Sequence, residues 1–199
     1  MFKKSLAVIF TFVMAFSCIS CGEKIDPPDK VVASYLDALK NGDLTSAKAF
    51  VNEENDEILS ETEDESANTL IKSILKNLTY EVVSTDAKDT TATVKTSIKN
   101  IDMKTVMGEV FSELLSLAFS GLDAEALEAK QNEAFAKALE TNKETIKETE
   151  VNIQLEKKET GWIIIPTEDL ADGITGGLLS YADNLNSSFG GTPEEEKAN

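Results

Sequence analysis

The sequence predicts an α+β fold, and the prediction rests on the spacing of its apolar residues. Apolar residues recur at helical spacing over 31–78 and again over 103–147. Two other stretches, 80–98 and 150–166, contain segments in which apolar and polar residues alternate with a period of two, at 92–98 and 150–156, which is typical of strands with one wet face. Each of these stretches contains a short polar turn. We therefore expect two antiparallel hairpins with helices packed against their apolar faces.

The first stretch of helical spacing divides into three predicted helices. Asp26-Pro27-Pro28-Asp29 should cap the first helix, with proline in its first turn, and Asn41-Gly42 should end it. Asp43 should then cap a short second helix, and a third follows the acid-rich run Glu53–Glu65. The residues expected to face the core are Val31, Val32, Tyr35, Leu36, Leu39, Ala47, Phe50, Val51, Leu70, Ile71, Ile74, Leu75 and Leu78.

The residues between the two hairpins, 103–147, return to helical spacing. Met103–Leu122 should form one helix whose wide apolar face covers the sheet as core, although its methionines also suit a docking groove. Asp123 should cap a second, longer helix that reaches the end of this stretch. In the second hairpin, the continuous apolar run Trp162–Ile165 should lie centrally in the sheet and be covered on both sides.

The N-terminus carries the marks of a secretory signal. Met1–Lys4 are partly basic, and Leu6–Phe16 form an unbroken apolar run of about eleven residues, whereas a bilayer-spanning helix needs about 20. Both cysteines of the chain follow in Cys18-Ile19-Ser20-Cys21, and Gly22 comes next. This stretch resembles the bacterial lipobox, in which a small residue precedes the modified cysteine. Cys18 stands where that pattern usually has Leu, Val or Ile.

The lipobox resemblance implies a lipid anchor. It implies that the Cys21 thiol joins a diacylglycerol through a thioether and that the signal is cut between Ser20 and Cys21. The mature chain would then be held on the extracytoplasmic face of the cell membrane. The other interpretations are two incidental cysteines in a signal that is simply removed, or a disulfide between Cys18 and Cys21, which would close a very small loop.

Composition excludes several functional classes. The chain has 19 basic residues, all lysine, 36 acidic residues and no histidine. Loss of Lys3 and Lys4 with the signal leaves 17 lysines and 36 acids, a net charge of −19, which disfavours nucleic acid as a partner. Without histidine, and with the remaining cysteine acylated, Ser-His-Asp and Cys-His catalysis and zinc sites are excluded. The acid run Glu53–Glu65 lacks the glycine of a calcium loop, so we expect no metal and no cofactor.

Three features together resemble the NTF2-like (cystatin-like) lipoproteins of bacteria, a group largely made of domains of unknown function. They are the helical stretch VVASYLDALKNGDLTSAKAF, the antiparallel sheet after it, and a late hairpin that ends in GWIIIP. The resemblance spans Asp29–Pro166. It implies a curved antiparallel sheet wrapped around the first helices as a cone, with a pocket or an interaction face. The insertion 103–147 departs from the small family form, and it can fill the cone or cover it as a lid.

We therefore expect a single folded domain between two unstructured ends. The signal peptide covers 1–20, the lipid-anchored tether 21–29, the NTF2-like domain 30–185, and a disordered acidic tail 186–199. Within the domain, a glycine-weakened helix over Leu170–Tyr181 follows the second hairpin.

The sequence favours a non-catalytic binding or protein-interaction module anchored in the cell envelope through Cys21. Its partner would be an envelope protein or a small apolar ligand. The candidates for a pocket or interface are Tyr35, Tyr80, Met107, Phe111 and Trp162. The alternative is an NTF2-like enzyme that uses a carboxylate and a tyrosine as an acid–base pair in the cone, with Asp37 or Asp43 supplying the carboxylate. No single residue is assigned a catalytic role, because the scaffold by itself selects none of these functions.

Overall fold

The fold is described for residues 25–51, 65–117 and 121–188 of a computed structural model. No helix within these ranges is both long enough and apolar enough to cross a membrane. The elements in chain order are α1 (Pro28–Lys40), α2 (Leu44–Lys48), α3 (Glu65–Leu75), β1 (Thr79–Ala87), β2 (Thr91–Ile101), α4 (Met103–Leu117), α5 (Ala124–Thr141), β3 (Ile146–Lys158), β4 (Gly161–Ile165), α6 (Glu168–Ile174) and α7 (Leu178–Ser188).

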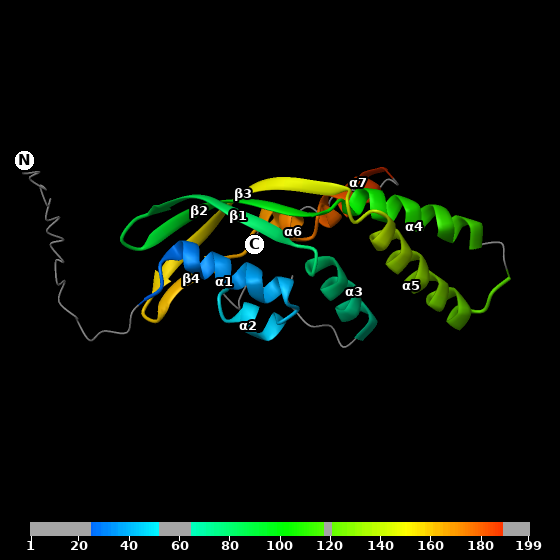
Figure 1. The fold of residues 1–199 in the computed structure, drawn as a ribbon, viewed down its shortest axis with the longest axis horizontal. Helices are drawn as coiled ribbons and strands as arrows, with labels where there is room; N and C mark the ends of the chain where they lie inside the picture. The colour runs from blue at the N-terminus through cyan, green and yellow to red at the C-terminus, as the bar shows by residue number, and fades with distance from the viewer. Residues whose placement is uncertain (1–24, 52–64, 118–120, 189–199) are drawn as a thin grey trace, which may run out of the picture.

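The four strands form one curved antiparallel sheet in the order β1-β2-β3-β4, with helices packed against it (Figure 1). This arrangement confirms the predicted α+β fold, including the helical insertion between two hairpins. The longest pairing joins β2 to β3, from Thr91 opposite Glu156 to Ile101 opposite Ile146. The two central strands therefore set the length of the sheet.

The two faces of the sheet differ as the alternating sequence predicts. One face carries exposed ion pairs between β2 and β3, Lys95 with Glu150 at 3.0 Å and Lys99 with Glu148 at 3.4 Å. The other face carries apolar side chains that are buried under helices. Its buried members on β2 and β3 are Ala92, Val94, Ile98, Val151, Ile153 and Leu155.

The short N-terminal helices form close to the predicted positions. Pro28 occupies the first turn of α1, where its missing N–H costs nothing. The Oδ1 atom of Asp43 accepts a 3.0 Å hydrogen bond from the backbone N–H of Ser46 and so caps α2, as predicted. The expectation that Asp26 caps α1 is wrong, because the N-cap residue is Pro27, which makes no side-chain cap bond.

The inner face of the sheet is filled by the protein's own side chains. Helices α1 and α6 lie against it, and α6 packs closely enough that a Cβ on Gly173 would stand 3.1 Å from the Val151 Cγ2 atom. The space that a cone-shaped fold would offer as a pocket is thus occupied by a core. Its largest fully buried members are Leu36, Leu39, Leu75, Leu78, Ile98, Ile153, Leu155, Ile164 and Leu170.

The insertion between β2 and β3 is a hairpin of α4 and α5 that projects beyond one end of the sheet (Figure 1). We call residues 103–141 the helical hairpin. Its helices pack on each other around a second, smaller core, so the expectation that α4 covers the sheet is wrong. The helical hairpin therefore neither fills nor covers the inner face of the sheet. The members of this core are Ile74, Ile101, Met103, Val106, Val110, Phe135, Ala138 and Leu139.

Helix α5 ends at Thr141, whereas the sequence predicts a helix reaching Lys147. The Asn142 side-chain N–H donates a 2.9 Å hydrogen bond to the Ala138 carbonyl and closes the last turn. The β-branched Ile146 then begins β3 and extends the pairing with β2.

Strand β4 lies at the edge of the sheet, so the expectation that Trp162–Ile165 lies centrally and is covered on both sides is wrong. The inward side chains of Trp162 and Ile164 are buried, whereas the two isoleucines that alternate with them are only half-buried. Part of the outer edge is covered, because the Ile164 N–H donates a 2.8 Å hydrogen bond to the Phe50 carbonyl and Ile164 bridges to Val51.

The predicted C-terminal helix is divided into α6 and α7. Gly176 and Gly177, at φ of 65° and 87°, turn the chain between them, a conformation that glycine adopts without strain. A Cβ on Gly176 would collide with the backbone carbonyl of Ile101, so this position has no room for a side chain. Helix α7 takes in residues 186–188 of the predicted tail, and residues 189–199 lie outside the described ranges.

Candidate functional site

The predicted lipidation site, Ser20-Cys21, lies outside the described residues, and so does the acid run Glu53–Glu65 except for its last residue, which begins α3. The first described residue is Ile25, which is 40% exposed, and α1 begins shortly after it at Pro28. In Figure 1 this start of α1 and the tip of the helical hairpin lie toward opposite ends of the longest axis. The described chain therefore begins at the end of the domain that lies away from the hairpin tip.

Two of the predicted pocket residues, Tyr35 and Trp162, are part of the main core. Their exposed fractions are 2% and 8%. Tyr35 comes from α1 and Trp162 from β4, and both belong to the cluster that fills the inner face of the sheet. Their large side chains therefore serve packing between α1 and the sheet.

A third candidate, Tyr80, forms the carboxylate–tyrosine pair that the enzyme hypothesis requires. Its hydroxyl donates to the Asp37 Oδ1 atom at 2.9 Å and lies 3.1 Å from the Ala33 carbonyl oxygen. Partial burial, together with the adjacent Asp37 carboxylate, raises the pKa of Tyr80 to about 12. The phenol thus keeps its proton at neutral pH and joins α1 to β1, while Asp43 is used as the cap of α2.

The remaining candidates, Met107 and Phe111, lie on α4, and they differ in exposure. Met107 is half-buried against the small core, whereas Phe111 is 51% exposed. Leu115, one helical turn after Phe111, is 54% exposed. The half-buried Leu114 connects these two side chains to the core, and the exposed Gly108 lies one turn before Phe111. We call Met107, Gly108, Phe111, Leu114 and Leu115 the α4 strip.

Neither Leu115 nor Gly108 was among the candidates predicted from the sequence. The spacing of Phe111 and Leu115, four residues apart, marks one side of a helix. A glycine inside a helix is unusual because it lowers helix stability. Gly108 could therefore have been noticed from the sequence as an exception within the predicted helix.

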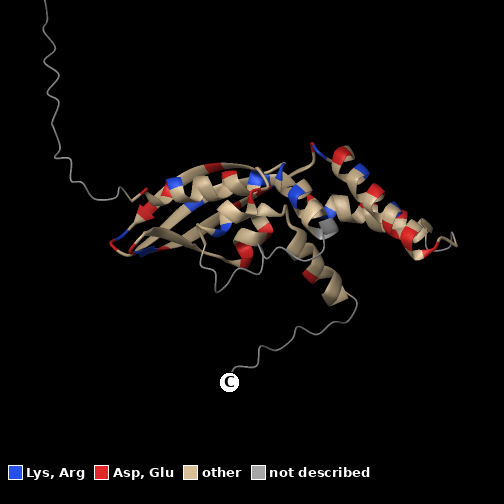
Figure 2. Cartoon of the chain, turned by 90° about the horizontal axis from the view of Figure 1, so that it is seen from below, with Lys and Arg blue, Asp and Glu red and all other residues tan. Residues whose placement is uncertain are grey.

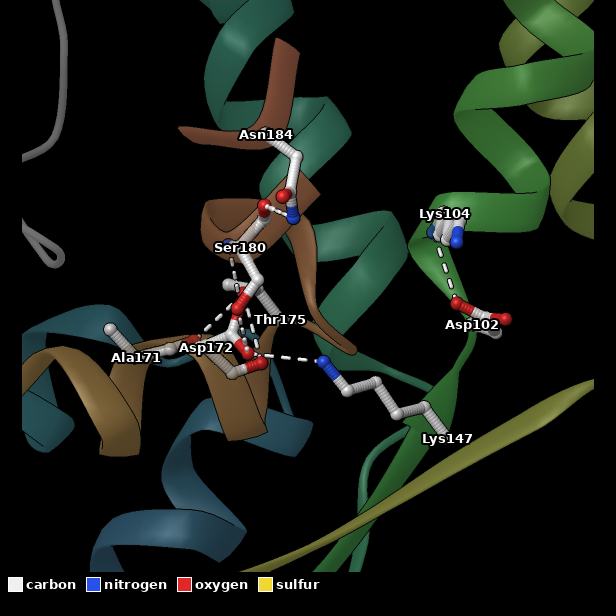
Figure 3. Close-up of polar contacts among 8 residues, drawn as sticks. All are labelled: Asp102, Lys104, Lys147, Ala171, Asp172, Thr175, Ser180 and Asn184. Carbon is white, nitrogen blue, oxygen red and sulfur yellow. Dashed lines mark hydrogen bonds and ion pairs between the residues drawn. The ribbon is translucent and has the colours of Figure 1, made fainter. Parts of the chain in front are cut away.

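A second group of polar side chains joins α6, α7 and β3, and it was not predicted (Figure 3). Asp172 accepts hydrogen bonds from the Ser180 N–H and the Ser180 hydroxyl, both at 2.8 Å, and pairs with the Lys147 ammonium at 3.1 Å. Partial burial acts to raise the pKa of Asp172, but the bonds from Ser180 and Lys147 outweigh it and hold the pKa below its usual value. Because Ser180 lies in the first turn of α7, Asp172 serves as the cap and charge partner of that helix.

A groove of about 390 Å³ runs between α3 and α5. Leu70, Phe135 and Leu139 give it apolar walls, and Thr69, Ser73 and Asn132 add polar atoms. None of the predicted pocket residues lines it. Its size is at the lower end of the range for small-molecule sites.

Figure 2 colours the chain by charge, and basic and acidic residues are distributed along the whole described chain, with several acidic residues on the helical hairpin. Residues 103–141 carry seven acids and three lysines. In the described part of the chain, no group of three or more metal-ligating side chains is close enough to hold a metal ion.

The comparisons with known proteins give one distant structural likeness. No protein-family model matches the chain, and no curated protein matches it. The chain is similar to a crystal structure from Bacillus subtilis subsp. subtilis str. 168, described as that of "a putative lipoprotein (ycdA)", at a TM-score of 0.40 and 15% identity. The match covers 76% of this chain and 47% of that one, so the chain spans about half the length of the structure it matches. At this distance the likeness carries no argument about function.

Proposed function

We propose that this protein is a lipid-anchored module of the cell envelope that presents a protein-interaction surface and has no catalytic role. The anchor is Cys21, and the domain lies on the extracytoplasmic face of the membrane. The support for the anchor is the basic start, the short apolar run and the lipobox-like Cys18-Ile19-Ser20-Cys21 of the sequence. We also keep the NTF2-like assignment of the scaffold as part of this proposal.

The tether would hold the domain close to the membrane. The segment from Cys21 to Pro28 spans at most about 25 Å when fully extended. The start of α1 would therefore stay near the lipid surface, and the helical hairpin would lie at the other end of the domain (Figure 1). This placement leaves the hairpin accessible to other envelope proteins.

The observation that carries the interaction hypothesis is the contrast between a filled sheet interior and an exposed helix face. Tyr35 and Trp162, which would line a cone pocket, are buried in the main core. Phe111 and Leu115 on the hairpin are instead more than half exposed. Large apolar side chains that gather on a projecting element mark a surface for a partner more often than a requirement of the fold.

The anchor is tested by comparing Cys21→Ser with the matched variant Cys18→Ser. We expect wild type and Cys18→Ser to sediment with membranes, and Cys21→Ser to be released or to keep its signal peptide. Cell fractionation together with the intact mass of each chain separates these results. A Cys21→Ser chain that has lost its signal and still stays on the membrane would contradict the anchor.

The interaction half of the proposal is tested by native mass spectrometry of the full chain released from its own membranes. An additional mass the size of a protein supports the module. An additional mass the size of a small molecule would instead favour a ligand-binding protein, with the groove between α3 and α5 as its first candidate site.

A further inference from the structure

We propose that Asn41 is a modification site at which the protein deamidates spontaneously, and that the fold controls the rate of this reaction. Asn41 is followed by Gly42, and it is the only asparagine of the chain that precedes a glycine. It is also exposed to solvent, where α1 ends and the chain turns toward α2. The proposal goes beyond the interaction module described above and does not rest on it.

The reaction needs only the chain itself and water. The Gly42 backbone nitrogen loses its proton to solvent and bonds to the Asn41 Cγ atom. The bond from Cγ to Nδ2 breaks, and the Nδ2 group takes up a proton and leaves as ammonia, so the chain now holds a succinimide ring. Water then opens the ring at one of its carbonyl groups, which leaves either aspartate or isoaspartate at position 41. Glycine favours ring closure because it has no side chain to obstruct the approach.

The fold requires the glycine of this pair but not the asparagine. Gly42 has a φ of 71°, so it ends α1 in the left-handed conformation that glycine adopts without strain. Its N–H donates a 2.9 Å hydrogen bond to the Leu39 carbonyl, and the Asp43 N–H donates one of 2.9 Å to the Ala38 carbonyl. Asn41 itself has helical backbone angles, φ −80° and ψ −2°, which are ordinary for other residues. Position 41 can therefore hold another side chain while the turn is kept.

The folded turn opposes the reaction. At a ψ of −2°, the Gly42 nitrogen eclipses the backbone nitrogen of Asn41 and not its Cβ atom. Ring closure requires a rotation about the Cα–C bond of Asn41 that brings the Gly42 nitrogen beside Cγ. That rotation moves the N–H groups of Gly42 and Asp43 away from their carbonyl partners, so both hydrogen bonds must break first. Deamidation should therefore proceed from a locally opened turn, at a rate set by how often the end of α1 opens.

The isoaspartate product does not fit the turn. It places an extra carbon atom in the main chain before Gly42, so the two hydrogen bonds that close the turn cannot both form again. It also adds a carboxylate at the C-terminal end of α1, where the helix dipole disfavours negative charge. Deamidation at Asn41 thus weakens the connection between α1 and α2.

The effect should reach the edge of the sheet through α2. Leu44 and Ala47 of α2 are buried in the main core. The residues that follow α2 lie beside β4, because the Phe50 carbonyl accepts a 2.8 Å hydrogen bond from the Ile164 N–H. A loosened connection should therefore speed hydrogen exchange at the Ile164 N–H as well as in α2.

The test follows the purified full chain by peptide mapping and mass spectrometry during warm incubation. Deamidation exchanges ammonia for water and so raises the mass of the peptide that holds Asn41, and electron-transfer fragmentation distinguishes isoaspartate from aspartate. Asn132 and Asn152 are internal references, because both are exposed and neither precedes a glycine. Asn41→Gln is the matched variant, since it keeps the amide group but its longer side chain would have to close a larger ring.

We expect Asn41 to be modified faster than both references, in the folded chain and in urea. Folding should slow the reaction at Asn41 at least about tenfold, because the turn must open first. The rate should rise with pH, since the attacking nitrogen has to lose a proton. Asn41→Gln should stay unmodified and should not show the faster Ile164 exchange of the incubated wild type. Circular dichroism establishes that this variant is folded.

Three results would overturn the proposal. The first is modification of Asn41 no faster than that of Asn132 and Asn152, in the folded or in the unfolded chain. The second is an equal rate at Asn41 in the folded and unfolded chains, which would remove the control by the fold. The third is isoaspartate at position 41 with unchanged hydrogen exchange in α2 and at Ile164. Each of these leaves the Cys21 anchor and the interaction surface standing.

Discussion

Replacing Asp172 with asparagine should destabilise the protein by about 2 kcal/mol. The Asp172 carboxylate accepts two 2.8 Å hydrogen bonds from Ser180 and pairs with Lys147, and only 16% of its side chain is exposed. A hydrogen bond to a charged group contributes about 1.5–3 kcal/mol, and a lost helix cap costs about 0.5–2 kcal/mol. Asparagine keeps one acceptor oxygen for the Ser180 N–H but places its NH2 group where the Lys147 ammonium and the Ser180 hydroxyl had an acceptor, so part of the total is lost.

The effect of this substitution should depend on pH. Since the folded protein lowers the pKa of Asp172, its carboxylate stabilises the fold above the unfolded pKa of about 3.9, and this contribution is lost as the pH falls through the lower folded pKa. The difference in unfolding free energy between wild type and Asp172→Asn should therefore be largest near neutral pH. It should shrink steadily once the pH drops below about 4.

Urea unfolding followed by tryptophan fluorescence measures this difference directly. Trp162 is the only tryptophan of the chain and is 8% exposed, so it reports on the main core. Asp183→Asn is the matched control, because Asp183 is an exposed acid on α7. Equal unfolding free energies for wild type and Asp172→Asn at neutral pH would refute the reasoning, and so would a difference that stays constant into acid.

Two further substitutions test other contacts. Tyr80→Phe removes the hydroxyl that donates to Asp37, so it should lower the unfolding free energy by about 1 kcal/mol, and ultraviolet titration of wild type should show one phenol with a pKa near 12 that the variant lacks. Leu139→Ala should cost about 2–3 kcal/mol in the small core and speed hydrogen exchange in α4 and α5 first, with little change at Trp162. The matched variant Leu36→Ala lies in the main core and should change both. A Leu139→Ala chain that loses its Trp162 signal together with the hairpin would show that the two cores are one cooperative unit.

The fold was predictable wherever one local pattern decides it. The alternation of Ala92, Val94 and Ile98 with polar residues predicted which face of β2 is buried, and the structure confirms it. Asp43 was a recognisable cap because its side chain bonds within its own turn. Such features depend on neighbours in the sequence, so the sequence alone contains the information.

The remaining features depend on contacts between distant segments. Ile163 and Ile165 made β4 resemble a central strand, but the order of strands in a sheet is decided by which chain segments meet. The direction in which the helical hairpin leaves the sheet follows from contacts such as the 3.0 Å bond from the Met103 N–H to the Gly176 carbonyl. No local pattern indicates a bond between residues that far apart.

In the candidate site, too, the sequence predicted some residues correctly and others wrongly. Phe111 was predicted as an interface residue and is exposed, whereas Tyr35 and Trp162 were given the same role and are buried. Helical spacing says that an apolar residue lies on the apolar face, but not whether another helix covers that part of the face. The exposure of Leu115 depends on which side of α4 packs against the rest of the protein, and helical spacing alone does not give this.

The central claim is that Cys21 carries a lipid and begins the mature chain. The most direct measurement is the intact mass of the protein purified from the membranes of the cells that make it. We expect a chain that starts at Cys21 and carries the added mass of a diacylglyceryl group. A chain that keeps its signal, or one that is cut elsewhere and has an unmodified Cys21 thiol, would contradict it.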